Sequence, residues 1–264
     1  MDEIMSRIKQ VFQNADTHKT LVAYITAGDP NLETTLELMH SLADNGADII
    51  ELGVPFSDPM SDGPTIQRAA ERALANRVSL ADVLETVRRF RQSNQSTPVV
   101  LMGYLNPIHK MGYEPFARAA KEAGVDGVLT VDSPIETVAP LHNALKAAGL
   151  DTIFLVAPTT GEERMAEIAK LASGFVYYVS LKGVTGSASL NTAEVAEKVA
   201  VLRRHVPLPI CVGFGISDAE SARQIAAVAD GVVIGSRIVK EIEANPGREA
   251  EAAGKLVKSL KEAV

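Results

Sequence analysis

The sequence predicts a (β/α)8 barrel, a closed ring of eight parallel strands surrounded by helices. Short β-branched apolar runs alternate with amphipathic segments along all 264 residues, and they make eight strand–helix units. Each unit averages about 33 residues, and the total is close to the roughly 250 residues typical of this fold. The strand runs are mostly unbroken apolar stretches, as expected of a parallel sheet that is buried on both faces.

A doubly wound open sheet is the alternative arrangement of the same alternating elements. We prefer the barrel because both the number of units and the chain length match it. The prediction is one domain over residues 1–264, with an extra N-terminal helix. No linker rich in Pro, Gly or Ser divides the chain.

The elements follow from the apolar pattern in chain order. The predicted strands are Leu21–Thr26, Ala47–Leu52, Pro98–Met102, Gly127–Val131, Thr152–Ala157, Phe175–Ser180, Ile210–Gly213 and Gly231–Ile234. The helices between and after them are predicted from amphipathic segments. They include Leu32–Asn45, Leu80–Arg91, Glu114–Ala123, Ala139–Ala148, Glu162–Ala172, Ala193–Arg204, Ala219–Ala227 and Arg248–Lys261.

Three segments that follow strands have the spacing of a capping box, in which a residue before a helix and one three positions later bond each other's backbone. They are Ser133–Glu136, Thr160–Glu163 and Ser217–Glu220. We interpret them as helix starts with little functional content, because the motif is common.

An aspartate also precedes three of the predicted strands, at Asp48, Asp126 and Asp230. The chain enters its strands at the bottom face of a barrel, whereas active sites lie at the top. We therefore interpret these three carboxylates as structural turn and capping residues.

Composition excludes several classes of protein. The 26 Lys and Arg residues against 33 Asp and Glu give a net charge of −7, which disfavours binding to nucleic acid or anionic lipid. Trp is absent and aromatic residues make up 5% of the chain, so there is little surface for stacking on bases. The one cysteine, Cys211, forms no internal disulfide and fits a reducing compartment.

No targeting signal is apparent either. Residues 1–13 carry mixed charges without the apolar core of a signal peptide. No apolar run approaches the roughly 18 residues that a membrane span needs. The expectation is a cytoplasmic protein.

Two carboxylates at the second strand exit are the first catalytic candidates. Glu51 lies near the end of an apolar strand, where burial raises a carboxyl pKa toward the range that suits proton transfer. A structural ion pair is an equally good interpretation from the local sequence. Asp62 follows in a proline-stiffened loop, and its local alternative is a turn residue before Gly63.

Glycine clusters after the last two strands predict a phosphate site. The segment 212–217 follows strand seven and the segment 234–237 follows strand eight. Glycines let backbone N–H groups approach an anion, and barrels often bind phosphate at these two strand ends. The loop 182–187 is a candidate lid over the same ligand.

Lys182 offers a different chemistry, because a lysine near a strand end can form a Schiff base with a carbonyl substrate. We prefer a solvated loop lysine, since Lys182 lies outside the apolar run. A metal site is not expected, because the five histidines are scattered and none stands at a strand exit with carboxylates. Cys211 is interpreted as a core residue.

Taken together, these motifs resemble those of the tryptophan synthase α subunits. The resemblance runs from about Ile8 to the C-terminus and rests on several ordered motifs. These are Tyr24-Ile-Thr-Ala-Gly-Asp-Pro30, the run Glu51 to Gln67, Gly103-Tyr-Leu-Asn-Pro107, Gly183-Val-Thr-Gly186 and Gly213-Phe-Gly-Ile216.

The resemblance implies a TIM barrel that is a carbon–carbon lyase of tryptophan biosynthesis. Its reaction would be retro-aldol cleavage of indole-3-glycerol phosphate to indole and glyceraldehyde 3-phosphate. Glu51 matches the catalytic glutamate that takes the glycerol hydroxyl proton and is implicated in protonating the indole carbon. Asp62 matches the aspartate that stabilises positive charge on the indole nitrogen.

The resemblance also implies a substrate-binding set. The phosphate would be bound by Gly186, Phe214, Gly215, Gly235 and Ser236. The indole would be lined by Tyr24, Tyr104, Leu129 and Tyr177, with Tyr177 placed to hydrogen-bond near Glu51. Thr185 would contact Asp62 when the lid closes.

The implied assembly is an αββα heterotetramer in which indole passes to a β subunit. Pyridoxal phosphate would belong to that partner, and this chain would carry no cofactor. Asp58, Pro59, Asn106 and Pro134 match the face toward the β subunit. The sequence departs from the common pattern at Ser61, Ser133 and Leu181-Lys182, which bears on loop conformation and subunit signalling rather than on the reaction.

Three alternatives stay open from the sequence. One is a stand-alone lyase that releases free indole, and another is a Schiff-base aldolase using Lys182. The third is a non-catalytic barrel that only activates a partner, although such a module has no use for Glu51 in an apolar strand.

Overall fold

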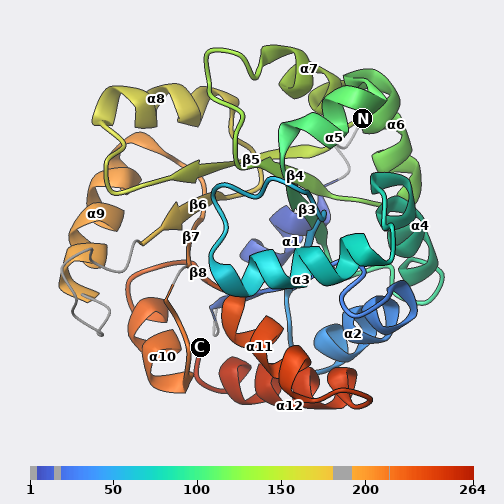
Figure 1. The fold of residues 1–264 in the computed structure, drawn as a ribbon. Helices are drawn as coiled ribbons and strands as arrows, with labels where there is room; N and C mark the ends of the chain where they lie inside the picture. Colours follow the sequence, from blue (N-terminus) through green and yellow to red (C-terminus); the bar gives the residue numbers. More distant parts are fainter. Residues whose placement is uncertain (1–4, 15–18, 181–191, 214) are drawn as a thin grey trace.

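The computed structural model describes residues 5–14, 19–180, 192–213 and 215–264. Within them, eight parallel strands form a closed barrel in the order β1 to β8 (Figure 1). The ring closes between β1 and β8, where Thr20 pairs with Gly231 and Ala23 with Ile234. This closure confirms the predicted (β/α)8 barrel and excludes the open sheet.

All eight predicted strands form, and their ends lie within two residues of the predicted ones. They are β1 (Thr20–Thr26), β2 (Ile49–Gly53), β3 (Val99–Gly103), β4 (Gly127–Thr130), β5 (Asp151–Val156), β6 (Val176–Val179), β7 (Ile210–Gly213) and β8 (Gly231–Ile234).

The helices surround the barrel. They are α1 (Arg7–Gln13), α2 (Leu32–Asp44), α3 (Pro64–Ala75), α4 (Leu80–Phe90), α5 (Leu105–Met111), α6 (Tyr113–Ala123), α7 (Ala139–Ala147), α8 (Glu162–Leu171), α9 (Thr192–His205), α10 (Ala219–Ala226), α11 (Ser236–Ala244) and α12 (Glu249–Lys261). No helix in the described ranges is long and apolar enough to cross a membrane.

The pattern analysis did not include α3, α5 and α11 among its helices. Pro64 and Pro107 are typical of turns, yet Pro64 occupies the first position of α3, where a missing N–H costs nothing. Helix α11 begins directly after Gly235, so its first residues lie within the segment 234–237 that was predicted as a glycine-rich phosphate loop.

The capping predictions were largely wrong. No helix starts at Ser133, because α7 begins only at Ala139. The N-cap of α8 is Gly161 without a side-chain bond, while the Thr160 hydroxyl accepts a hydrogen bond from Ala157 N–H at 3.1 Å. A capping box does start α10, but it joins Asp218 and Ser221, one residue later than predicted. The Thr160 hydroxyl thus bonds the backbone of a local turn and is not available to cap α8.

The three strand-entry aspartates have the structural role that was predicted. Each carboxylate accepts the N–H of a residue in the preceding strand. Asp48 accepts from Leu21 at 2.7 Å, Asp126 from Val99 at 2.8 Å and Asp230 from Ile210 at 2.8 Å. The repeated Asp-plus-strand pattern thus fixes neighbouring strands at the bottom of the barrel.

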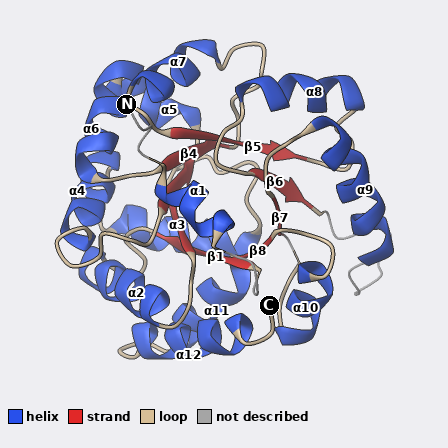
Figure 2. Ribbon diagram, turned by 180° about the vertical axis from the view of Figure 1, so that it is seen from behind, coloured by secondary structure: helices blue, strands red, loops and turns tan. Residues whose placement is uncertain are grey.

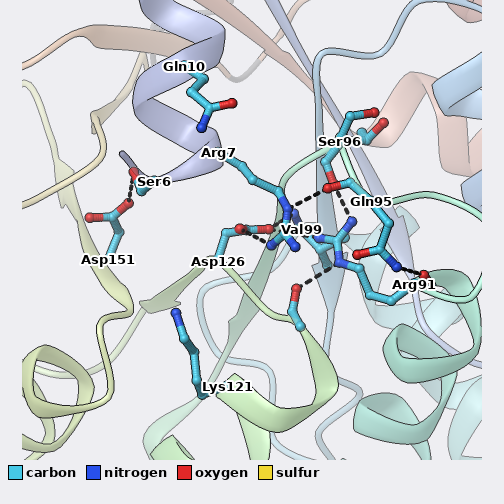
Figure 3. Close-up of polar contacts among 12 residues, drawn as sticks. Ser6, Arg7, Gln10, Arg91, Gln95, Ser96, Val99, Lys121, Asp126 and Asp151 are labelled. Atoms are coloured by element: carbon cyan, nitrogen blue, oxygen red, sulfur yellow. Dashed lines mark hydrogen bonds and ion pairs between the residues drawn. The ribbon is translucent and has the colours of Figure 1, made fainter. Parts of the chain in front are cut away.

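The predicted N-terminal helix, α1, covers that bottom opening, as seen from behind in Figure 2. Ile8 is fully buried in the barrel interior with Ile153 and Phe175. Figure 3 shows how polar contacts hold the helix: Arg7 donates to Asp126 at 2.8 Å, and the Ser6 hydroxyl donates to Asp151 at 3.2 Å.

Asp126 is the centre of the bottom contacts. Its carboxylate is buried and also receives Arg91 at 2.8 Å, whose guanidinium donates further to the carbonyls of Gly124, Asn94 and Thr97. Burial lowers the pKa of Arg91 to about 10, and the Asp126 carboxylate acts in the opposite direction. The pair is therefore a buried charge pair with its hydrogen bonds satisfied.

Asp126→Asn should destabilise the fold by about 3 kcal/mol, because it leaves the buried Arg91 charge without its partner. The measurement is the midpoint of urea unfolding. Glu33→Gln is the control, since Glu33 pairs with Arg89 on the exposed surface and its loss should shift the midpoint little. Equal shifts in the two variants would contradict this account.

Candidate active site

The candidate site lies at the top of the barrel, where the strands end. Val22 and Ile49 point into the interior, and side chains two residues further along each strand point the same way. This alternation brings Tyr24 and Glu51 into the interior one layer higher, and the two are direct neighbours in the β1–β2 register. The strand period thus places a carboxylate inside the barrel.

Glu51 is almost completely buried, at 1% exposure. Its Oε1 atom has no hydrogen-bond partner among the described residues. Loss of hydration raises the pKa of Glu51 to about 8, with a smaller contribution from the nearby negative charge of Asp62. A carboxyl group in this state can both release and take a proton near neutral pH.

Asp62 lies in the loop between β2 and α3, and it is half-buried. The Tyr104 hydroxyl, after β3, donates to Asp62 Oδ2 at 3.3 Å and accepts the Ser61 N–H at 3.0 Å. Burial raises the pKa of Asp62, and the bond from Tyr104 acts in the opposite direction. From α3, the Gln67 side-chain amide donates to the Asp62 carbonyl at 2.8 Å.

Tyr24 and Tyr177 are both buried in the barrel interior, on β1 and β6. Each has a strand-end glycine beside its hydroxyl, Gly53 for Tyr24 and Gly213 for Tyr177, and an added Cβ at either glycine would collide with the ring. The Tyr24 hydroxyl shares a 3.2 Å hydrogen bond with Thr26. The glycines therefore provide the space that the two rings occupy.

Leu129, the remaining predicted indole contact, is fully buried in the interior on β4. Tyr177 was predicted to hydrogen-bond near Glu51, and no direct hydrogen bond joins these two side chains. Their proximity shows instead in the pKa of Tyr177, which burial raises well above its usual value and the Glu51 charge raises further.

The predicted phosphate residues that can be described lie at the ends of β7 and β8. Gly215 has a φ of +82°, a conformation that favours glycine. Gly235 is the N-cap of α11 and makes no side-chain capping bond, so the first N–H groups of that helix are suited to an anion. Gly235 also contacts Tyr24, because an added Cβ would lie 3.3 Å from the tyrosine Cβ.

Four predicted positions fall outside the described residues: Lys182, Thr185, Gly186 and Phe214. In the remainder of the chain, no group of three or more His, Cys, Asp or Glu side chains is arranged to hold a metal ion. The described part of the predicted site consists of two carboxylates, three tyrosines, Leu129, Gly215 and the start of α11.

Thr26, Gln67, Gly53 and Gly213 support this set; they lie within the motifs noted in the sequence, but their roles beside Asp62 and the two tyrosines were not predicted. A signal for the glycines was present, because a glycine inside an apolar strand often marks a close approach. Nothing in the local sequence distinguishes Gln67 from any other polar residue of a helix.

The chain was compared with known proteins. The sequence model of the family described as tryptophan synthase alpha chain matches residues 11–264. The tryptophan synthase alpha chain of Neisseria meningitidis serogroup B is 66% identical over 260 residues, which cover 98% of this chain and 100% of that protein.

Solved structures agree. Tryptophan synthase subunit alpha from Legionella pneumophila superposes with a TM-score of 0.92 at 45% identity, covering 98% of both chains. A chain from the tryptophan synthase α2β2 complex of Pyrococcus furiosus superposes with a TM-score of 0.85 at 39% identity, covering 92% of this chain and 99% of that one.

The raised pKa of Glu51 predicts a pH-dependent stability. Between its ordinary value of 4.5 and about 8, the folded protein holds a proton that the unfolded chain has released, so stability falls as pH rises. Glu51→Gln removes this group and should flatten the decline of the urea midpoint between pH 5 and pH 8. Parallel profiles for the two proteins would refute the assignment of a raised pKa to Glu51.

Proposed function

The chain belongs to the tryptophan synthase alpha chain family and is a lyase of tryptophan synthesis, and from this premise we propose how its residues divide the reaction. The proposed reaction is retro-aldol cleavage of indole-3-glycerol phosphate to indole and glyceraldehyde 3-phosphate. The observation that carries it is the buried Glu51 carboxyl, whose Oε1 has no hydrogen-bond partner in the described ranges, in the barrel interior near Asp62.

Glu51 is proposed as the proton-transfer group. Glu51 first gives its proton to the indole carbon that bears the glycerol chain, which makes the ring an electron acceptor. Glu51 then takes the proton of the adjacent glycerol hydroxyl, the carbon–carbon bond breaks, and its electrons return to the indole as the aldehyde forms. A pKa of about 8 suits a group that must give and take protons near neutral pH.

Asp62 is proposed to stabilise the positive charge that develops on the indole nitrogen. A carboxylate works here only when ionised, and the hydrogen bond from Tyr104 favours that form. The same bond fixes the direction of the carboxylate. Because the protonated ring serves as the electron acceptor, the proposed route needs no cofactor, metal or Schiff base in this chain.

The substrate phosphate is proposed to bind at Gly215, Gly235 and Ser236, together with Gly186 and Phe214. The start of α11 supports this site, because it offers backbone N–H groups and a partial positive charge without a competing side-chain cap. Tyr24, Tyr104, Leu129 and Tyr177 are proposed to line the indole, and Thr185 to contact Asp62 on closure.

A β subunit is the proposed partner, in an αββα assembly that takes up the indole. The relationship to a chain of the Pyrococcus furiosus α2β2 complex supports this. Asp58, Asn106 and Pro134, proposed for the shared face, are exposed side chains. Neighbouring Met60 is an apolar side chain with 81% exposure, as expected of a surface that a partner covers.

The first test is indole release from indole-3-glycerol phosphate, with and without a purified β subunit. Slow release alone and strong acceleration by the β subunit would establish the synthase role. Fast release without a partner would indicate a stand-alone lyase, and no release in either case would refute the proposed reaction. Borohydride with a carbonyl substrate should leave Lys182 unlabelled.

Glu51→Gln should lower the rate of indole release by about 10²-fold or more, because an amide cannot accept the hydroxyl proton. The measurement is kcat at saturating substrate, with binding checked separately by inhibition with glycerol 3-phosphate. Inhibition should be retained, since the phosphate site does not include Glu51. An unchanged kcat would rule out Glu51 as the proton-transfer group.

The pH profile gives a second test of Glu51. Because Glu51 must begin the reaction protonated in order to give its proton to the indole carbon, kcat/KM should be highest below about pH 8 and should fall as the pH rises above it. Tyr104→Phe removes a bond that lowers the pKa of Asp62, so it should shift any lower inflection upward. A profile that is flat from pH 6 to pH 9 would contradict the assignment.

A further inference from the structure

A network of ion pairs joins three elements beside the site, and Arg72 on α3 is its centre. Arg72 Nε and Nη2 donate to the two carboxylate oxygens of Asp29 at 2.7 and 2.8 Å. Arg72 Nη1 donates to Glu243 on α11 at 2.8 Å. Arg68, one turn earlier on α3, donates to both oxygens of Glu243 at 3.1 Å.

The Asp29 end of the network is buried, which separates it from ordinary surface ion pairs. Asp29 follows β1 and is 2% exposed, and Arg72 meets its carboxylate with the two-pronged geometry that only arginine provides. The bond to Asp29 raises the pKa of Arg72 further, so the guanidinium stays charged. Ion pairs on the surface contribute little to stability. A buried carboxylate that is paired with an arginine is instead held in one position, because breaking the pair is costly.

The network joins α3 and α11, and the proposed reaction takes place at the N-terminal ends of these two helices. Asp62 stands just before α3, and Gln67 of α3 holds its carbonyl at 2.8 Å. Gly235 and Ser236, proposed for the phosphate, begin α11. Ala69 of α3 and Val239 of α11 pack together with Tyr24 of β1, and Figure 1 shows the two helices side by side.

This arrangement fixes a distance that the reaction depends on. The indole nitrogen and the phosphate are opposite ends of one substrate, so Asp62 and the start of α11 must lie at a set separation. The apolar contact of Ala69 with Val239 is non-directional, whereas Arg72 joins α3 to Asp29 and Glu243 through directed hydrogen bonds. Asp29 connects the pair of helices to the end of β1.

We propose that Arg72 is a positioning residue that, by binding Asp29 and Glu243 together, sets the separation between Asp62 and the phosphate-binding start of α11. The inference rests on the proposed function, because it uses the roles of Asp62 and α11 given there. Arg72 touches no substrate and acts through α3, Gln67 and α11.

The test compares Arg72→Lys with the wild-type chain in indole release. Lysine keeps the charge but cannot bind both Asp29 oxygens and Glu243 at once. We expect kcat to fall and KM to rise, with kcat/KM lowered roughly tenfold or more, while circular dichroism shows a folded protein. Arg89→Lys is the matched control, because Arg89 makes a similar two-pronged pair with Glu33 between α4 and α2, and both constants should stay unchanged.

Glu243→Gln separates the two ends of the network, because it weakens the link to α11 and leaves the Asp29 pair intact. KM and the inhibition constant of inorganic phosphate should rise together by several-fold, while kcat stays within about twofold of the wild type. This variant also serves if Arg72→Lys fails to fold.

The outcomes are distinct. If the wild-type chain releases no indole with or without a β subunit, the proposed function fails, and this inference with it. If the wild type is active and both folded variants match Arg89→Lys in kcat, KM and phosphate inhibition, the positioning role alone is refuted. The positioning role is also refuted if the variants lose activity only in proportion to the fraction of protein that is unfolded.

Discussion

Burial of the Glu51 carboxyl is the constraint on which the rest of the site depends. A carboxylate inside a barrel loses its hydration, and neither a lysine nor an arginine among the described residues compensates it. Glu51 is nevertheless buried in the upper layer of the barrel, where Tyr24 and Tyr177 are also buried. Gly53 and Gly213 leave the space that the two tyrosine rings occupy. The result is a proton-transfer group with a pKa near neutrality, and Asp62 close by raises it further.

The polar groups at the two ends of the barrel differ in how they are paired. At the bottom, every strand-entry aspartate of the repeat is bonded to a backbone N–H and to a basic side chain, so charge there stabilises the fold. The helix α1 closes this end with Ile8 and Arg7. At the top, one Glu51 oxygen has no partner within the part of the chain that the structure describes, and α11 begins without a side-chain cap. The Glu51 oxygen and the start of α11 thus lie where a substrate could satisfy them, although Thr20 Oγ1 at the bottom also lacks a partner among the described residues.

The loops that carry the site are held from outside the barrel. Asp62 is fixed by Tyr104 from the next strand end and by Gln67 from the helix that follows it. The network of Arg72, Asp29 and Glu243 then relates that helix to α11. A precise site can thus be built on loops, because helices packed on the rigid barrel support them.

The barrel, its eight strands and the family could be predicted from the sequence, because the strand period and the run from Glu51 to Gly63 are local patterns and the chain length suits eight strand–helix units. The same run marked Glu51 and Asp62 as catalytic candidates, and their roles stay a prediction. The sequence did not determine which helices start at Pro64, Leu105 and Ser236, since turn and helix signals coincide there. It also could not show that Glu51 Oε1 has no partner among the described residues, that Gly53 and Gly213 make room for tyrosines, or that Arg72 meets Asp29 and Glu243. Those facts depend on contacts between residues up to 171 positions apart, which only the closed barrel brings together.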